Sequence, residues 1–219
     1  MWDEAMLWML LQGIGETLYM TLVSTLFAYV IGLPLGIALV AFAKGGIRPH
    51  PVLYKVLDVI VNLTRSIPFI ILLMAIIPFT RWVVGTTLGS TAAIVPLTLS
   101  AAPFVARLVE SSIQEVDVGV IEASQSMGAS TLQIIWKVML PEARPSLIVN
   151  CAIASVTILG YTAMAGIVGA GGLGDIAIRF GYYRYEDEVM FVTVVLIIVV
   201  VQILQGIIMN IAKHSDRRK

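Results

Sequence analysis

Three polar side chains interrupt an apolar stretch near residue 60 and have the chemistry to contact a polar solute inside a membrane. Asp58, Asn62 and Arg65 stand at i, i+4 and i+7, so they share one face of a helix, and Ser66 follows directly. An ionisable group within a membrane span usually faces the bundle interior or a water-filled cavity, because contact with lipid is costly. Two interpretations stay open: this face lines a solute path, or Asp58 and Arg65 stay near the cytoplasmic interface, paired or snorkelling to water.

A second candidate lining follows residue 160, where a tyrosine, a methionine and several glycines come close together. Tyr161 and Met164 stand near the outer half of an apolar stretch, and a methionine thioether is adaptable enough to plug a narrow pore or simply to fill a packing gap. Gly166, Ala170 and Gly174 recur at spacing four, the small-residue pattern that brings membrane helices together. The five glycines of this stretch equally suggest a broken helix with exposed backbone.

The longest predominantly polar interruption runs from Asp117 to Pro145 and has the marks of ordered structure. Asp117 can cap a short helix that stops at Gly128, a residue type that tolerates the left-handed conformation at a helix end. Ser130 and Gln133 then form a capping-box pattern that opens a second helix. The segment is therefore predicted to be a helix–turn–helix loop.

The second helix of this loop is predicted to be amphipathic. Leu132, Ile135 and Met139 stand at i, i+3 and i+7, which gives one apolar stripe. Pro141 and Pro145 are expected to close this helix and begin a new element.

Residue sets for other kinds of chemistry are not found. The sequence contains no GxxxxGK[ST] phosphate loop, and His50 and His214 are isolated, so neither a nucleotide site nor a metal site is expected. Arg107 and Glu110, three residues apart, are expected to form a local ion pair. The chain is predicted not to be an enzyme, so any energy for transport must enter through a partner.

The elements that must position these residues are membrane helices. Of 219 residues, 58% are hydrophobic and only 13% are charged, with a mean hydropathy of +0.93. Soluble domains carry about 25% charged residues, so the fold class is an all-α polytopic membrane protein. A cleavable signal peptide is not expected, because residues 1–4 are acidic and the first basic residue is Lys44.

Hydropathy divides the chain, taken as a single domain of residues 1–219, into five transmembrane helices. Gly32, Pro34 and Gly36 permit a bend within the first of them. Residues 5–11 are apolar but too few to cross a bilayer and are expected to lie at the interface. The five predicted spans cover residues 17–42, 57–79, 86–109, 146–168 and 189–212.

Five spans put the termini on opposite sides of the membrane, and the distribution of basic residues predicts which side is cytoplasmic. One side carries three basic residues, Arg81, Arg179 and Arg184. The other carries ten: Lys44, Arg48, Lys55, Arg107, Lys137, Arg144, Lys213, Arg217, Arg218 and Lys219. The positive-inside rule therefore predicts an outside N-terminus, a cytoplasmic C-terminus and a cytoplasmic loop at residues 117–145. A net charge of zero argues against nucleic acid as a partner.

The loop also carries a recognisable spacing. Its residues are Glu122, Ala123 and Ser124, then Gly128 after three residues, then Val138, and then Leu140 and Pro141. This pattern resembles the EAA loop of permease subunits of binding-protein-dependent ABC importers, with Ser124 and Val138 as mild departures. Further stretches resemble the methionine-import type, and the likeness extends from about Gly15 to Tyr183: residues 65–70, 93–98, 101–104 and 169–174.

The resemblance implies a type I ABC importer permease fold and a complete transport assembly. It implies two copies of this chain around a central path in the bacterial cytoplasmic (inner) membrane, two ABC ATPase subunits that hold ATP and Mg, and an extracytoplasmic solute-binding protein. The implied solute is D- or L-methionine or a close analogue. The residues assigned to coupling with the ATPase are Ile121, Glu122, Ala123, Ser124, Met127, Gly128, Leu140 and Pro141. The resemblance implies that the span with Tyr161, Met164 and Gly166 lines the translocation path, with Met164 as a gate, while Asn62, Arg65 and Ser66 are path candidates from their polar helix face alone.

Alternatives remain at this stage. The polar loop could be a hairpin that packs only on its own membrane helices. The importer could carry another small solute such as an osmoprotectant, because such permeases have a similar Gly-rich ending. An ion-coupled secondary transporter predicts acidic residues in several spans and paired broken helices, whereas Asp58 is the only acid predicted near a span interior. A receptor or scaffold would not stimulate a partner ATPase.

Overall fold

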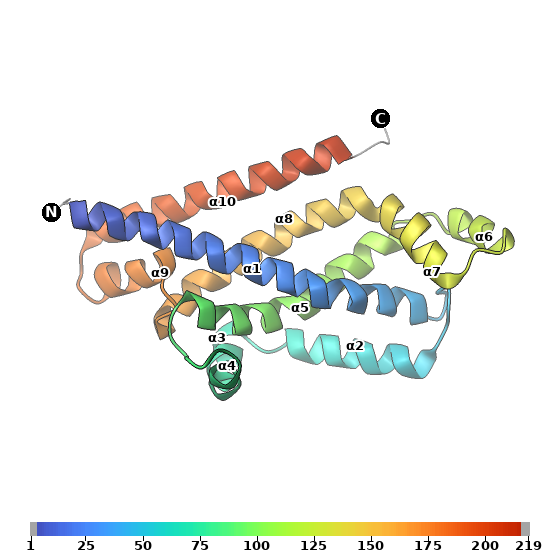
Figure 1. The fold of residues 1–219 in the computed structure, drawn as a ribbon, viewed down its shortest axis with the longest axis horizontal. Coiled ribbons are helices and arrows are strands. Elements are labelled where there is room, and N and C mark those ends of the chain that lie inside the picture. Colours follow the sequence, from blue (N-terminus) through green and yellow to red (C-terminus); the bar gives the residue numbers. More distant parts are fainter. Residues whose placement is uncertain (1–3, 216–219) are drawn as a thin grey trace.

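The computed structural model describes residues 4–215, which fold into an elongated bundle of helices (Figure 1). Among these residues, four helices are long and apolar enough to cross a membrane, and a bent helix pair makes a fifth crossing if the two helices are counted as one span. The N-terminal end of α1 lies at one end of the bundle with α9, whereas α6 and α7 lie at the other (Figure 1). Of the basic residues counted for orientation, Arg217, Arg218 and Lys219 lie outside the described part of the chain.

The first crossing is one long helix, α1, Glu4–Phe42. Residues 5–11 are its first turns, so the prediction of a separate interfacial helix was wrong: the apolar run continues through Gly13 and Gly15 without a helix-ending signal. Pro34 lies inside the helix, and Gly32 and Gly36 face the next long helix, α5, Ser90–Gln114. These glycines serve close packing between helices.

The second crossing is broken: the predicted span over residues 57–79 is not one continuous helix. Helix α2, Pro51–Arg65, and helix α3, Phe69–Ala75, meet at an angle of 97°. Pro68 is the cause, because proline disfavours helical backbone in the residue before it and has no N–H to donate. A short helix α4, Ile77–Val84, follows and ends at Gly85 in the left-handed conformation.

The fourth crossing is continuous from the polar loop to the Gly-rich segment. It comprises α7, Thr131–Ile134, the π-helical segment η1, Ile135–Met139, α8, Leu140–Ala165, and the 3₁₀ segment η2, Gly166–Val168. Pro141 and Pro145 therefore do not close a helix. Pro141 stands in the first turn of α8, where its missing N–H is tolerated. The π-helical segment just before it has the wider i→i+5 hydrogen-bond spacing, so the helix continues past the proline.

The Gly-rich stretch breaks the helical path at the other end of the bundle. Gly169, Gly171 and Gly172 all have positive φ, and the chain then turns into α9, Gly172–Ile176, and a π-helical segment η3, Ala177–Tyr182. The last crossing is α10, Asp187–Ser215. A broken helix was one of two readings of these glycines, and the backbone bears it out.

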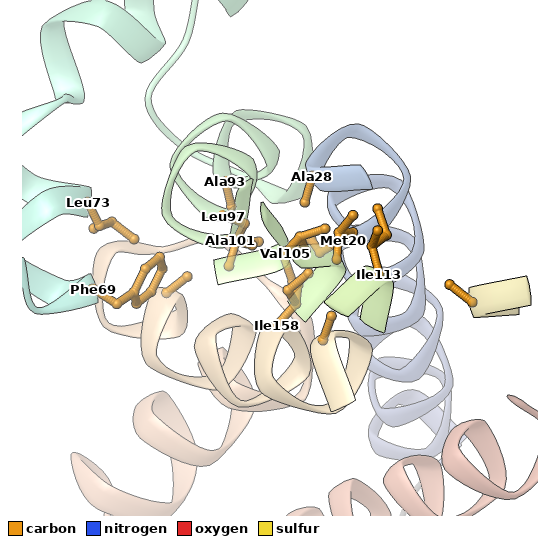
Figure 2. Packing of buried hydrophobic residues seen from close by; sticks show 14 of the residues in the cluster. Met20, Ala28, Phe69, Leu73, Ala93, Leu97, Ala101, Val105, Ile113 and Ile158 are labelled. Carbon is orange, nitrogen blue, oxygen red and sulfur yellow. The ribbon is translucent and has the colours of Figure 1, made fainter. Parts of the chain in front are cut away.

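The core lies where α5 packs against both α1 and α8. Met20 of α1, Leu97 and Val105 of α5, and Ile158 of α8 are fully buried and point toward one another (Figure 2). Gly32 allows this approach, since a Cβ there would lie 2.7 Å from the carbonyl oxygen of Ala102. Exposed large apolar side chains recur along α1, α2 and α10, as expected for a protein whose solvent is lipid.

Candidate functional site

The polar loop folds as the capping residues predicted. Helix α6, Val118–Ser126, begins at Asp117, whose carboxylate accepts a 2.7 Å hydrogen bond from the amide of Gly119, and the turn after it passes through Gly128 at a φ of +83°. Ser130 and Gln133 form the predicted capping box, in which the amide of Ser130 donates to Oε1 of Gln133 at 2.8 Å. The loop is thus a helical hairpin held by its own local hydrogen bonds.

The side chains of this hairpin divide between two directions. Ile121 packs against the core of the bundle and Ser124 is buried, so neither of these two implied coupling residues lies on the exposed face of the hairpin. Glu122 and Ala123 are exposed, and Met127 is 80% exposed. The outward face therefore contains Glu122, Ala123 and Met127.

Two exposed apolar residues beside this face were not predicted. Leu132 and Trp136 stand four residues apart on α7 and η1 and are 67% and 64% exposed. Of the predicted apolar stripe, Ile135 and Met139 therefore lie in the core together with Ile134, whereas Leu132 does not. Among the motif residues that follow, Leu140 packs on the core and Pro141 is exposed.

A charged cluster joins α2 to α5. The guanidinium of Arg107 donates to the carboxylates of Asp58 and, at 2.6 Å, Glu110, and to the side-chain oxygen of Asn62 at 2.9 Å. The predicted Arg107–Glu110 pair is confirmed. The Asp58 contact was missed because its partner is 49 residues away, and the cluster of one guanidinium and two carboxylates carries a net charge of −1.

Arg65, two turns beyond Asp58 on α2, has a different environment. Its guanidinium carbon lies 5.9 Å from the centre of the Phe104 ring on α5, and the side chain is exposed. It forms no ion pair with any carboxylate in the described residues. Ser66 caps the end of α2 by donating its hydroxyl to the carbonyl of Asn62 at 2.8 Å.

The break between α2 and α3 also meets α8. Phe69, the first residue of α3, stacks on Tyr161 with ring centres 4.6 Å apart and planes 6° from parallel. One turn beyond Tyr161, the side chain of Met164 is 39% exposed, and Gly160 has no atom within 4 Å of the position of an added Cβ. Gly166 is buried against the backbone around Asp175, so it is a packing position and not part of an exposed lining.

At the opposite end from the hairpin, α1 holds the Gly-rich turn in place. Glu16 accepts a 2.7 Å hydrogen bond from the amide of Gly172, and the hydroxyl of Thr17 accepts one of 2.9 Å from the amide of Leu173. These contacts satisfy two of the free amides at the start of α9, and Glu16 and Gly172 line a polar cleft of about 440 Å³. Sequence reasoning missed them because 156 residues separate the partners.

Metal-binding geometry is lacking in the part of the chain that the structure describes. No group of three or more His, Cys, Asp or Glu side chains is placed to hold a metal ion among residues 4–215.

Comparison with known proteins identifies the family. Residues 32–219 match the model of the binding-protein-dependent transport system inner membrane component. This chain belongs to that family. The family assignment confirms the predicted multi-pass inner-membrane permease, and the all-helical importer fold expected from the EAA spacing is also confirmed.

Similar permeases are known in sequence and in structure. A probable D-methionine transport system permease protein of Vibrio cholerae is 50% identical over 210 residues, which cover 96% of this chain and 93% of that protein. The D-methionine transport system permease protein of Escherichia coli is 52% identical over 164 residues, or 75% of this chain and 76% of that one. A chain of the MetNI methionine ABC transporter, solved in inward-facing conformations, matches with a TM-score of 0.96 and 49% identity over 98% of this permease and 100% of that chain.

Proposed function

We propose that this permease is the transmembrane subunit of an ATP-driven importer that carries methionine, as either enantiomer or a close analogue, into the bacterial cytoplasm. The observation that carries the proposal is the near-complete likeness to the methionine transporter chain, at 49% identity and a TM-score of 0.96. The 50% identical Vibrio cholerae relative is named for D-methionine, which agrees. The chain is a transport subunit and not an enzyme.

The proposed assembly contains two copies of this chain, two ATPase subunits and an extracytoplasmic solute-binding protein. ATP and Mg would be held by the ATPase subunits. The proposed topology places the N-terminus outside and the C-terminus in the cytoplasm. The excess of basic residues on one side supports this orientation, and so does the position of the hairpin at the end of the bundle away from the start of α1 (Figure 1).

The proposed coupling surface is the outward face of the hairpin. Glu122, Ala123 and Met127 would contact the ATPase, with Leu132 and Trp136 as adjoining apolar contacts. Ile121, Ser124, Gly128, Leu140 and Pro141 would support this surface by fixing the hairpin on the core and shaping its turn. Exposed methionine and tryptophan side chains on a well-capped helical hairpin suit a groove in a partner protein.

The proposed solute path follows the broken second crossing and the exposed side of α8. Asn62, Arg65, Ser66 and Met164 are exposed, and Tyr161 is fixed beside them by its stack on Phe69. Irregular backbone and an unpaired charge at membrane depth are tolerated where they line a cavity or meet other protein. Met164 would act as the gate.

Reconstituted uptake tests the proposal. The permease, its ATPase and its binding protein are placed in proteoliposomes with ATP enclosed on the ATPase side, and the uptake of radiolabelled methionine and choline is measured. We expect ATP-dependent uptake of methionine and none of choline. Uptake of choline alone would replace methionine with an osmoprotectant-like solute, and ATP-independent uptake would remove the importer mechanism.

A matched pair of variants tests the coupling surface. Met127→Asp places a charge on the exposed face and should abolish stimulation of the ATPase by the loaded binding protein. Gln125→Asp places the same charge on another exposed position of α6 and serves as the control. Equal loss in both variants would show that the hairpin does not tolerate added charge, and the specific role of Met127 would be withdrawn.

A further inference from the structure

We propose that Arg65 is the binding site for the carboxylate group of the transported solute inside the membrane. The inference rests on the proposed function and adds to it a ligand group and a residue that holds it. Three observations carry it: the depth of the guanidinium, the lack of a protein carboxylate for it, and its exposure.

The depth follows from the contact with Phe104. Phe104 stands 14 residues after Ser90 and 10 before Gln114, the two ends of α5. At 1.5 Å per residue these offsets are about 21 Å and about 15 Å. Within the predicted span 86–109, Phe104 lies five residues, or about 8 Å, from the cytoplasmic end, so the guanidinium that it contacts lies inside the hydrocarbon core, in its cytoplasmic half. Because the guanidinium lies against this ring, we take Arg65 to be inside the membrane and not at its cytoplasmic surface.

No carboxylate of the protein is left for Arg65 at this depth. Among the residues of α2 to α5, the acids are Asp58 and Glu110, and both bind the guanidinium of Arg107. The membrane portions of the other long helices, residues 17–42, 146–168 and 189–212, contain no acid. A second copy of the chain adds two more carboxylates and a second Arg107 that already holds them. The Phe104 ring stabilises the cation but does not neutralise it.

A guanidinium that is exposed at this depth and has no carboxylate partner implies a water-filled path and an anionic ligand. A guanidinium binds a carboxylate through two parallel hydrogen bonds, and such charge-assisted bonds are strong away from bulk water. An amino acid solute brings such a carboxylate. Its ammonium group is in turn favoured by the Asp58–Arg107–Glu110 cluster, which has a net charge of −1 and lies about 10 Å nearer the cytoplasm along the same helix.

Substitution tests the charge and the shape of the site separately. In proteoliposomes holding the full complex, Arg65→Gln should lower the kcat/KM of methionine uptake about tenfold or more, while ATP hydrolysis stimulated by the loaded binding protein stays within about twofold. Arg65→Lys keeps the positive charge but lacks the planar guanidinium, so its kcat/KM should lie between those of the wild type and Arg65→Gln. Arg81→Gln, which removes an exposed arginine from α4, is the matched control and should behave as wild type.

Chemical rescue distinguishes a binding role from a structural one. Cys151 is the single cysteine, so Arg65→Cys in a Cys151→Ala background gives one reactive thiol. Methanethiosulfonate ethylammonium, which restores a positive charge, should recover uptake several-fold, and the ethylsulfonate reagent should not. Equal effects of the two reagents, no reaction at residue 65, or wild-type uptake by Arg65→Gln would overturn the inference and leave methionine import standing. A wild-type complex that imports no methionine would remove the proposed function and this inference together.

Discussion

Residues of the same type have opposite environments where helices pack together and on the exposed side of the same helices. Where helices pack together, Arg107 binds two carboxylates, and Gly36 contacts α5 so closely that a Cβ would lie 2.5 Å from the carbonyl oxygen of Ala106. On the open face, which we define as the exposed positions Arg65 of α2 and Gly160 and Met164 of α8, the arginine forms no ion pair within the described residues, and an added Cβ at Gly160 would meet no atom within 4 Å.

This contrast separates residues that hold the permease together from those that remain available to a solute or a partner. A membrane helix gains nothing from hiding apolar area, so close backbone approach and satisfied polar groups must provide the stability. Positions with neither property contribute little to folding. Substituting the same residue type at a packed position and at an open-face position therefore tests this distinction directly.

The largest loss of stability is expected from Gly36→Val. An added Cβ would lie 2.7 Å from the Cβ of Val109 as well as against Ala106, so α1 and α5 would have to separate, at a cost of about 3 kcal/mol. Thermal unfolding of the purified permease in detergent measures this. Gly15→Val on the same helix, where no atom lies within 4 Å of the added Cβ, is the control. Equal shifts in the two variants would contradict the close-packing role.

Arg107→Ala is expected to have the next largest effect. It leaves the carboxylates of Asp58 and Glu110 without a cation, and because the cluster is partly exposed we expect a loss of about 2 kcal/mol. The same unfolding measurement on Arg65→Ala should show little change. A combined Arg107→Met, Asp58→Asn and Glu110→Gln variant should recover much of the loss, since it removes the charges together. If Arg65→Ala proved the more damaging change, the two arginines would have been assigned the wrong roles.

Interactions within a few residues were predictable from the sequence, and those between distant residues were not. The Asp117 cap, the Gly128 turn and the Ser130–Gln133 box all appear as expected, because each depends on neighbours along the chain. The Asp58–Arg107 contact spans 49 residues, and no local pattern identifies it. It explains why Asp58 is tolerated in a membrane helix.

Some local signals were present but were outweighed or interpreted differently. Pro68 predicts a break, yet the long apolar run around it favoured one span, and the structure bends there by 97°. Gly32 and Gly36 were interpreted as a bend, whereas they form a contact surface for α5. A glycine pair at spacing four supports either role, and only the position of the neighbouring helix decides between them.

A smaller effect on stability, but a clear one on function, is expected from Met164→Ala. The side chain is 39% exposed, so its loss should cost less than 1 kcal/mol of stability. If Met164 is the gate, the variant should leak solute or hydrolyse ATP without transport. Solute efflux from loaded proteoliposomes and the ratio of uptake to ATP hydrolysis measure these two outcomes. Met20→Ala, at a fully buried position, should lower stability without a leak, and unchanged coupling and permeability in Met164→Ala would remove the gate.

The smallest expected effect is a gain, from Gly160→Ala. Glycine within a helix is less stable than alanine by about 0.5 kcal/mol or more, and an added Cβ at residue 160 meets no atom of the same chain within 4 Å. The isolated permease should therefore unfold at a slightly higher temperature. In the assembled transporter the same methyl group would project into the path or toward the second copy. Slower uptake with raised stability would place Gly160 on a surface that must stay open, whereas unchanged uptake would assign that side of α8 to lipid.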